Sequence, residues 1–357
     1  MEAISYLPTP DTIPAPWWLF EILDVLLFSL HILLVNVVVG GVLLLFFRRL
    51  SGSHDLNDSA PGILTNKLPT LLALGITIGI APLLFVQVVY GHLFYASSVV
   101  IASWWMLIIP ILIISYYLLY VQARSKSAGL ASVAALLGLI GFLYIGLLWA
   151  NNMTLMVEPQ RWTGYFADRE GWLLNLSEPT LWPRYLHFIA ASIAIAGLVS
   201  AIVWHFRKPS QPEVAEHRIA AGLSLFAYAT IAQILIGFWW LIALPRELML
   251  EFMGGSMAMT ILLLLGILLG IGALVVALLK KLALTVMHVS ALILVMSVMR
   301  AFLRSAYLRD VFSPSSLLIK PQYDVLVTFL VVLAVGLGCV WWMVKAIRRA
   351  DAKGVAA

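Results

Sequence analysis

Four histidines stand within long apolar segments of the chain, where an ionisable side chain is unusual: His31, His92, His187 and His288. An ionisable group in lipid is costly, so it usually faces the interior of a helix bundle, a proton path or a cofactor. Each imidazole could instead hydrogen-bond to a backbone carbonyl. Because four recur in one chain that lacks the charge pattern of a transporter, we favour haem ligation.

The positions of these histidines predict two levels of ligands. His92 closes the second apolar segment and His187 opens the fifth, so both should lie near one membrane surface. His31 and His288 enter from opposite surfaces, and a rise of about 1.5 Å per residue places both roughly 20 Å below the first surface. Two levels suit one or two b haems with His/His or His/Met ligation. Three methionines could serve the superficial level, although methionine is more often packing filler: Met253, Met257 and Met259.

Charged side chains gather at the same surface. Four arginines, whose N–H groups suit haem propionates or quinone carbonyls, lie at or just inside it: Arg184, Arg246, Arg300 and Arg304. Snorkelling to the interface is the alternative explanation for them. Glu21 and Asp24 are three residues apart at the start of the first segment and share a helix face. They could accept the protons released by a quinol, or form an exposed polar helix start.

The composition requires that membrane helices position these groups. Of 357 residues, 62% are hydrophobic and 11% charged, and the apolar runs are continuous, which favours helices over a barrel. The lone Cys339 excludes a disulfide within the chain, and no CxxCH motif offers covalent attachment of haem. We predict one all-α integral-membrane domain, 1–357, that binds haem b and quinone. Its transmembrane helices number about nine: 17–47, 68–95, 98–122, 129–150, 183–206, 218–244, 257–279, 283–305 and 323–346.

Alternate connections between these helices are basic, which predicts their orientation. The positive-inside rule places the N-terminus outside, the C-terminus in the cytoplasm and the long polar segment 151–182 outside. The net charge of +5 therefore reflects topology and contact with membrane lipid, and we expect no nucleic-acid partner. A connector as long as 151–182 is more often functional than a simple link.

Four segments in order along the chain resemble subunit I of the cytochrome bd quinol oxidase superfamily. They are FSLHILLVNVVVGG in the first span, YGHLFYASS at the end of the second, LLWANNMTLM at the end of the fourth and RYLHFIAASIAIAG in the fifth. The nine-span plan is also similar. The resemblance implies that His31 binds the haem of the high-spin centre and His187 the low-spin haem b. It places the family's methionine ligand at Met253 or Met257.

The chain also departs from this family at the positions that serve oxygen chemistry. Gln87 and Ala306 stand where the resemblance places glutamates, and the third span has no acid. The quinol-binding loop after the sixth span is reduced to PRELMLEFMGG. Because oxygen reduction needs polar residues that deliver protons to a buried site, we expect that the chain is not an oxygen reductase.

These features together predict a b-type cytochrome subunit in a bacterial inner membrane. By this interpretation the chain oxidises menaquinol or ubiquinol near the outer face. Electrons then pass to a periplasmic multihaem c-type cytochrome or another redox subunit, an expectation that rests on analogy. The alternatives are a haem-free quinone-binding anchor of a respiratory complex and a proton-coupled transporter.

Overall fold

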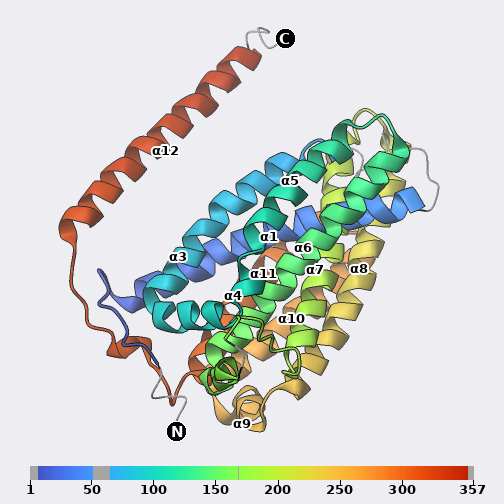
Figure 1. Cartoon of the computed structure of the whole chain (residues 1–357). Helices are drawn as coiled ribbons and strands as arrows, with labels where there is room; N and C mark the ends of the chain where they lie inside the picture. The colour runs from blue at the N-terminus through green and yellow to red at the C-terminus, as the bar shows by residue number, and fades with distance from the viewer. Residues whose placement is uncertain (1–6, 51–64, 168, 353–357) are drawn as a thin grey trace.

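Nine helices are long and apolar enough to cross a membrane in the computed structural model, which describes residues 7–50, 65–167 and 169–352 (Figure 1). They are α1 (Trp17–Leu50), α3 (Leu68–Val100), α4 (Ala102–Trp105) continued by α5 (Ile108–Arg124), α6 (Ala128–Val157), α7 (Leu181–Arg207), α8 (Pro212–Ala243), α10 (Met257–Leu278), α11 (Leu282–Tyr307) and α12 (Tyr323–Ala352). The predicted all-α bundle is confirmed for the described part of the chain, which is a multi-pass membrane protein by helix length and composition.

The long connector begins later than predicted. Residues 151–157 form the last two turns of α6, where their mostly buried side chains pack into the bundle. Pro159 then ends the helix, because proline lacks an N–H and restricts the residue before it. The 3-10 helix η2 (Pro159–Phe166) follows, and irregular chain continues to α7. Residue 168 of the predicted 151–182 loop lies outside the described residues.

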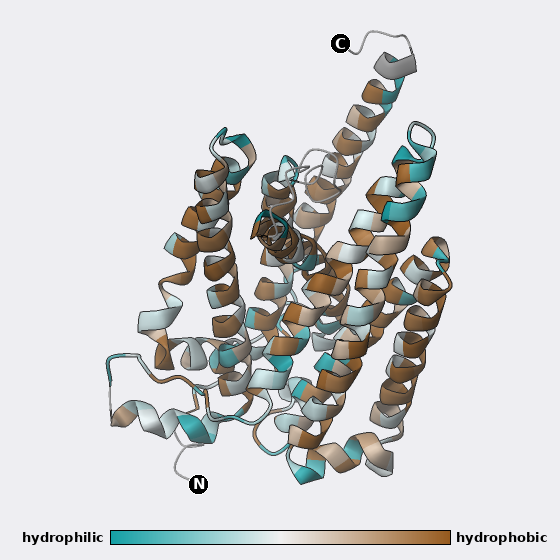
Figure 2. Ribbon diagram, turned by 90° about the vertical axis from the view of Figure 1, so that its right-hand side faces the viewer, coloured by the Kyte–Doolittle hydropathy of each residue, from teal (hydrophilic) through white to brown (hydrophobic). Residues whose placement is uncertain are grey.

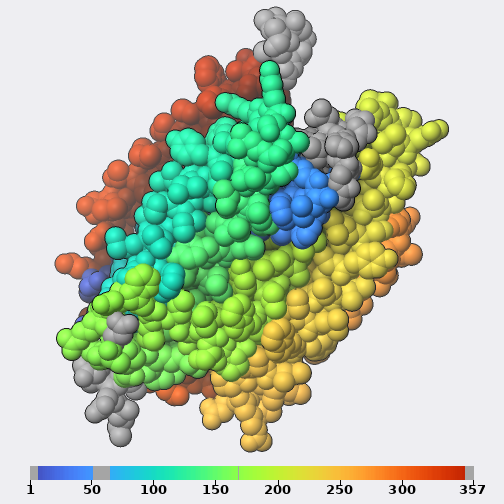
Figure 3. All heavy atoms as spheres, turned by 45° about the vertical axis from the view of Figure 1, so that its right-hand side comes forward, coloured from blue at the N-terminus to red at the C-terminus, as the bar shows by residue number. Residues whose placement is uncertain are grey.

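The connector defines one end of the bundle, which we call the loop face. Apolar side chains of segments 158–167 and 169–180 belong there to one core cluster with the start of α1, the end of α3 and the end of α11. Figure 3 shows the connector at this end of the molecule. Polar residues concentrate at the ends of the helices and apolar residues along their length, as a membrane requires (Figure 2). The five-residue α9 (Arg246–Leu250) and the π-helical turn η3 (Glu251–Gly255) join α8 to α10.

Helix α1 occupies the centre of the bundle, since it contacts α3, α6, α7 and α11. Helices α7 and α8 form the closest pair, and glycines let their backbones touch. A methyl group on Gly197 would lie 2.8 Å from the carbonyl oxygen of Gly222, and one on Gly222 would lie 2.7 Å from that of Gly197. Small residues at such contacts are typical of membrane helix pairs.

Helix α12 stands apart from the rest of the bundle (Figure 1). Its side chains from Tyr323 to Arg349 are exposed along its whole length. The segment before it is fixed to the N-terminal segment by two backbone hydrogen bonds. Ile13 N–H donates to Leu318 O at 2.9 Å and Lys320 N–H donates to Ile13 O at 2.8 Å. The chain therefore holds the start of α12 near the start of α1 and leaves its length unpartnered within the described residues.

Candidate functional site

A buried ionic cluster joins α1, α3 and α11 near the loop face. Arg304 donates to Glu21 Oε2 at 2.8 Å and to Asp24 Oδ2 at 3.1 Å. The Tyr90 hydroxyl donates to Glu21 Oε1 at 2.5 Å, and the Arg304 guanidinium lies over the Tyr90 ring, 4.4 Å from its centroid. Asp24 and Arg304 are 2% and 5% exposed, so the charges are held away from solvent. We call these four residues the carboxylate cluster.

The carboxylate cluster keeps unused hydrogen-bonding capacity. Asp24 Oδ1 has no hydrogen-bond partner within the described residues, and neither have Arg304 Nε and NH1. Phe20 and Phe85 also border the cluster, and the space left beside it is too small for a water molecule. Buried polar atoms are normally paired, so the unpaired Asp24 Oδ1 is a place where a proton can bind.

Arg300 lies one turn before Arg304 on the same face of α11, but it donates fewer hydrogen bonds. Its guanidinium is 3.8 Å from Asp24 Oδ2, donates to Met153 Sδ at 3.6 Å and stacks on the Phe28 ring at 4.2 Å. Sulfur is a weak acceptor, and 3.8 Å is longer than a hydrogen bond. Most of the five N–H donors of Arg300 therefore remain available.

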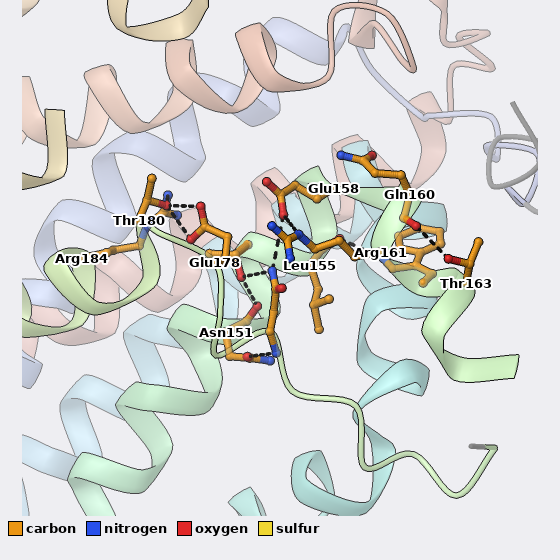
Figure 4. A network of polar contacts seen from close by, with 12 residues as sticks. Asn151, Leu155, Glu158, Gln160, Arg161, Thr163, Glu178, Thr180 and Arg184 are labelled. Atoms are coloured by element: carbon orange, nitrogen blue, oxygen red, sulfur yellow. Dashed lines mark hydrogen bonds and ion pairs between the residues drawn. The ribbon is translucent and has the colours of Figure 1, made fainter. Parts of the chain in front are cut away.

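A second polar network fixes the connector to the end of α6 (Figure 4). Asn151 Oδ1 accepts the backbone N–H of Asn175 at 2.7 Å, and the Asn175 amide donates to Thr154 Oγ1 at 3.1 Å and to Glu158 Oε2 at 3.5 Å. Arg161 forms an ion pair with Glu158. Asn151, Thr154 and Asn175 are buried, so the connector is held from inside the bundle.

The same network reaches the start of α7. The Thr180 hydroxyl lies 2.9 and 2.8 Å from the two carboxylate oxygens of the buried Glu178, and Arg184 donates to Thr180 Oγ1 at 3.3 Å (Figure 4). No carboxylate lies within 4.0 Å of Arg184 among the described residues. Its electrostatic neighbours are Tyr307, Glu178, Glu158 and the like-charged Arg300. The loop face thus assembles four arginines and four carboxylates: Arg161, Arg184, Arg300, Arg304, Glu21, Asp24, Glu158 and Glu178.

The predicted histidines lie apart from one another. His187 Nε2 has only a long contact, 3.5 Å, with the Gln233 amide, while His31 Nδ1 lies 2.9 Å from Gly75 O. His92 packs edge-on against Phe312, with ring centroids 4.4 Å apart. His288 Nδ1 lies 2.8 Å from Leu284 O in its own helix. No hydrogen bond or ring contact joins two of the four within residues 7–50, 65–167 and 169–352.

His187 has the surroundings that suit a haem ligand best, whereas the imidazoles of His31 and His288 are each packed against a glycine of a neighbouring helix. Haem iron needs an uncommitted imidazole nitrogen, and a ligating histidine usually has its other nitrogen bound to a carbonyl. His31 has this arrangement with Gly75. His187 follows Arg184 by three residues, so the imidazole and a guanidinium able to hold a propionate share one helix face, one turn apart. A methyl group on Gly272 would lie 2.9 Å from His288 Nε2, and one on Gly79 would lie 3.2 Å from His31 Nε2, so α10 and α3 each approach one of these rings closely.

Three predicted site residues lie outside both networks. Met253 and Met257 are 64% and 81% exposed, and Arg246 is exposed at the start of α9. The buried methionine of this region is Met259, which is 3% exposed and packs with Phe252 and other apolar residues. The structure therefore points the two methionines that the family resemblance selects away from the core of the bundle.

Sequence reasoning did not single out Tyr90, Glu158 or Glu178 as site residues. The two glutamates had a signal, because each precedes a proline at a boundary between helix and connector. A residue before proline is kept out of helical conformation, so its side chain can turn back toward a helix end. Tyr90 had no such signal, since tyrosine near a membrane surface is common.

No protein-family model matches the chain, and a search of curated proteins finds no similar sequence. The assignment of the site therefore rests on its residues and their geometry.

Proposed function

We propose that the chain is the b-haem subunit of a quinol-oxidising complex in a bacterial inner membrane, with the loop face directed outward. One observation carries this proposal. The loop face combines a buried carboxylate pair that has an unpaired oxygen with two arginines that have donors to spare, Arg300 and Arg184, and Arg184 precedes His187 by one helical turn. Proton acceptors and anion-binding groups are what quinol oxidation and haem binding each need.

The histidines and arginines support the electron-carrying half of this function. When bound, haem b supplies one-electron redox chemistry, and the protein supplies ligands and orientation. His187 would hold the iron through Nε2, while Arg184 and Arg300 would hold propionates. His31 would serve a second haem, deeper in the bundle, through the nitrogen that Gly75 leaves free.

The carboxylate cluster supports the proton-accepting part of this function. Oxidation of a quinol to a quinone releases two electrons and two protons. Asp24 has an unpaired oxygen, Oδ1, that can accept a proton, whereas both oxygens of Glu21 already accept hydrogen bonds from Tyr90 and Arg304. Arg304 would hold both carboxylates in place between turnovers. The position of the cluster near the loop face would let the protons leave on that side.

The connector would provide the surface on which an electron acceptor docks. Segment 158–182 carries several exposed large apolar residues that a soluble partner could cover: Phe166, Trp172, Leu176 and Trp182. Exposed apolar patches of this kind often mark interaction sites. A periplasmic multihaem c-type cytochrome or another redox subunit is the partner that we expect there.

The test is the haem content of purified variants. We expect His187→Ala to lose the reduced-minus-oxidised signal of one b haem and to lose reduction by quinol. His205→Ala is the matched control, because His205 is exposed at the opposite end of the same helix and should leave both properties intact. Full haem content in His187→Ala would contradict the assignment of this ligand.

A haem-free quinone-binding anchor is the second candidate. It is favoured by the observation that His31 and His288 already lie within hydrogen-bond distance of backbone carbonyls, at 2.9 and 2.8 Å, as structural histidines do. A pyridine haemochrome assay of the wild-type protein separates the two functions. The b-cytochrome proposal predicts one or two haems per chain, and the anchor predicts none.

A further inference from the structure

An apolar pocket of about 220 Å³ lies between the end of α3 and helix η2, separate from the histidines and the carboxylate cluster. Helix α3 lines it with small or branched side chains, and η2 lines it with aromatic ones: Ala96, Val99, Val100, Trp162, Tyr165 and Phe166. The pocket is almost entirely apolar and lies at the loop face. An apolar cavity of roughly 150 Å³ holds a benzene ring, so this pocket has room for a larger ring.

Hydrogen bonds on the far side of η2 hold the aromatic wall in place. The Trp162 indole N–H donates to Leu155 O at 2.9 Å, and Trp162 is 7% exposed. The Glu158–Arg161 ion pair fixes the first turn of η2 to the buried network of Asn175. Trp162, the buried part of the aromatic wall, is therefore held in place by the protein itself and does not need a ligand to order it.

The rim offers one polar group and an open side. The Thr163 hydroxyl lines the pocket and donates to Gln160 O at 3.0 Å (Figure 4). Because its hydrogen is used in that bond, its oxygen is left to accept one from a ligand hydroxyl. Val99 and Phe166, which also line the pocket, are 55% and 48% exposed, so a long apolar tail could leave between them.

We propose that this pocket binds the aromatic ring of the quinol. The inference rests on the proposed quinol oxidation and adds where the substrate sits. Aromatic walls suit a flat ring, Thr163 suits a quinol hydroxyl, and the exposed edge suits an isoprenoid tail that stays in lipid. Neither the apolar pocket walls nor Thr163 would retain a charged substrate.

The experiment fills the pocket with a larger side chain introduced on α3. Val99→Trp places an indole at the pocket rim, and Leu84→Trp is the matched control, because Leu84 is also half exposed on α3 and does not line the pocket. Binding of a short-tailed naphthoquinol is measured on the full-length protein in nanodiscs by anaerobic equilibrium dialysis. A photoreactive azido-naphthoquinone then maps the contact by peptide analysis. The dithionite-reduced spectrum and the thermal unfolding midpoint report the integrity of each variant.

We expect Val99→Trp to weaken naphthoquinol binding at least tenfold with an unchanged spectrum and midpoint, and Leu84→Trp to bind as the wild type does. The label should appear in segments 96–100 and 159–166. Wild-type affinity in Val99→Trp, or label only elsewhere, would overturn the pocket while leaving quinol oxidation standing. Label displaced by phospholipid but not by quinol would identify an acyl chain as the occupant and overturn it too. A wild-type protein that neither binds nor oxidises quinol would sink the proposed function itself.

Discussion

Arg304 is the residue on which the carboxylate cluster depends. It is the one cation within hydrogen-bond distance of both Glu21 and Asp24 among the described residues, and it is 5% exposed. Burying the charges of Glu21, Asp24 and Arg304 costs desolvation free energy, which only close pairing between them can offset. The cluster is therefore weak evidence for added stability, and it is better explained by a function that needs charge at this depth.

Replacing Arg304 by Met should destabilise the protein, because the carboxylate cluster depends on this arginine. The variant leaves two buried carboxylates without their closest cation, and removal of one partner from a buried pair costs about 3–5 kcal/mol. We expect a clearly lower thermal unfolding midpoint in detergent. Arg309→Met is the control, because the Arg309–Glu251 pair at 2.9 Å is 61% exposed on the arginine side and should cost about 1 kcal/mol or less. Equal midpoints for the two variants would contradict this account.

Individual residues also show what the sequence cannot predict. The arginines and the carboxylates could each be assigned to the same membrane surface from hydropathy and charge. Their pairing could not, since Glu21 and Arg304 are 283 residues apart and spacing along a chain does not say which helices become neighbours. The position of Met259 inside and Met257 outside likewise depends on how α10 is rotated, which a uniformly apolar helix does not reveal.

At the scale of elements, the contact between α7 and α8 positions the proposed haem ligand. His187 and Arg184 lie on α7, and Gly197 and Gly222 hold that helix against α8 with backbone contact. Because carbonyl oxygens of the backbone stand in the way, no side-chain rotation can make room for an added methyl group. The helices would have to separate.

Gly197→Ala should therefore destabilise the protein by about 1–3 kcal/mol, the usual cost of overpacking. It should also weaken any haem signal that depends on His187, because α7 shifts as a unit. Gly237→Ala on α8 is the control, since a methyl group there meets no atom within 4 Å and should be neutral. Thermal unfolding and optical spectra of the two variants check this, and a stable Gly197→Ala would show that the contact is looser than described.

The elements themselves were largely predictable. A membrane-spanning helix needs about 20 apolar residues, so hydropathy located all nine long helices of the described chain. It did not locate the end of α6, because Asn151 and Asn152 look like the start of a polar loop. Both are fully buried in the structure, where Asn151 bonds to Asn175 and Asn152 to Ser98. Hydropathy therefore misplaces a helix end where polar residues form hydrogen bonds inside the bundle.

At the scale of the whole molecule, the proposal requires that the loop face is external. Cys339 is the single cysteine, so a Cys339→Ala background allows one reporter cysteine at a time. We expect Ala167→Cys on the connector to react with a membrane-impermeant maleimide in intact cells. Ser210→Cys in the turn between α7 and α8 should react only after permeabilisation, because its neighbours Arg207 and Lys208 favour the cytoplasm. The reverse pattern would place the connector inside and remove the proposed periplasmic partner.

The sequence distance across the carboxylate cluster also sets a delay during synthesis. At roughly 5–20 residues per second, the ribosome needs about 14 to 57 s to make the 283 residues that separate Glu21 from Arg304. Throughout that interval the bonds of Glu21 and Asp24 with Arg304 cannot form, although α1 contacts four other helices in the finished bundle. We expect α1 to stay at the membrane surface, or bound to an insertase, until α11 is made. A chain that terminates before α11 should then be recognised as incomplete and degraded.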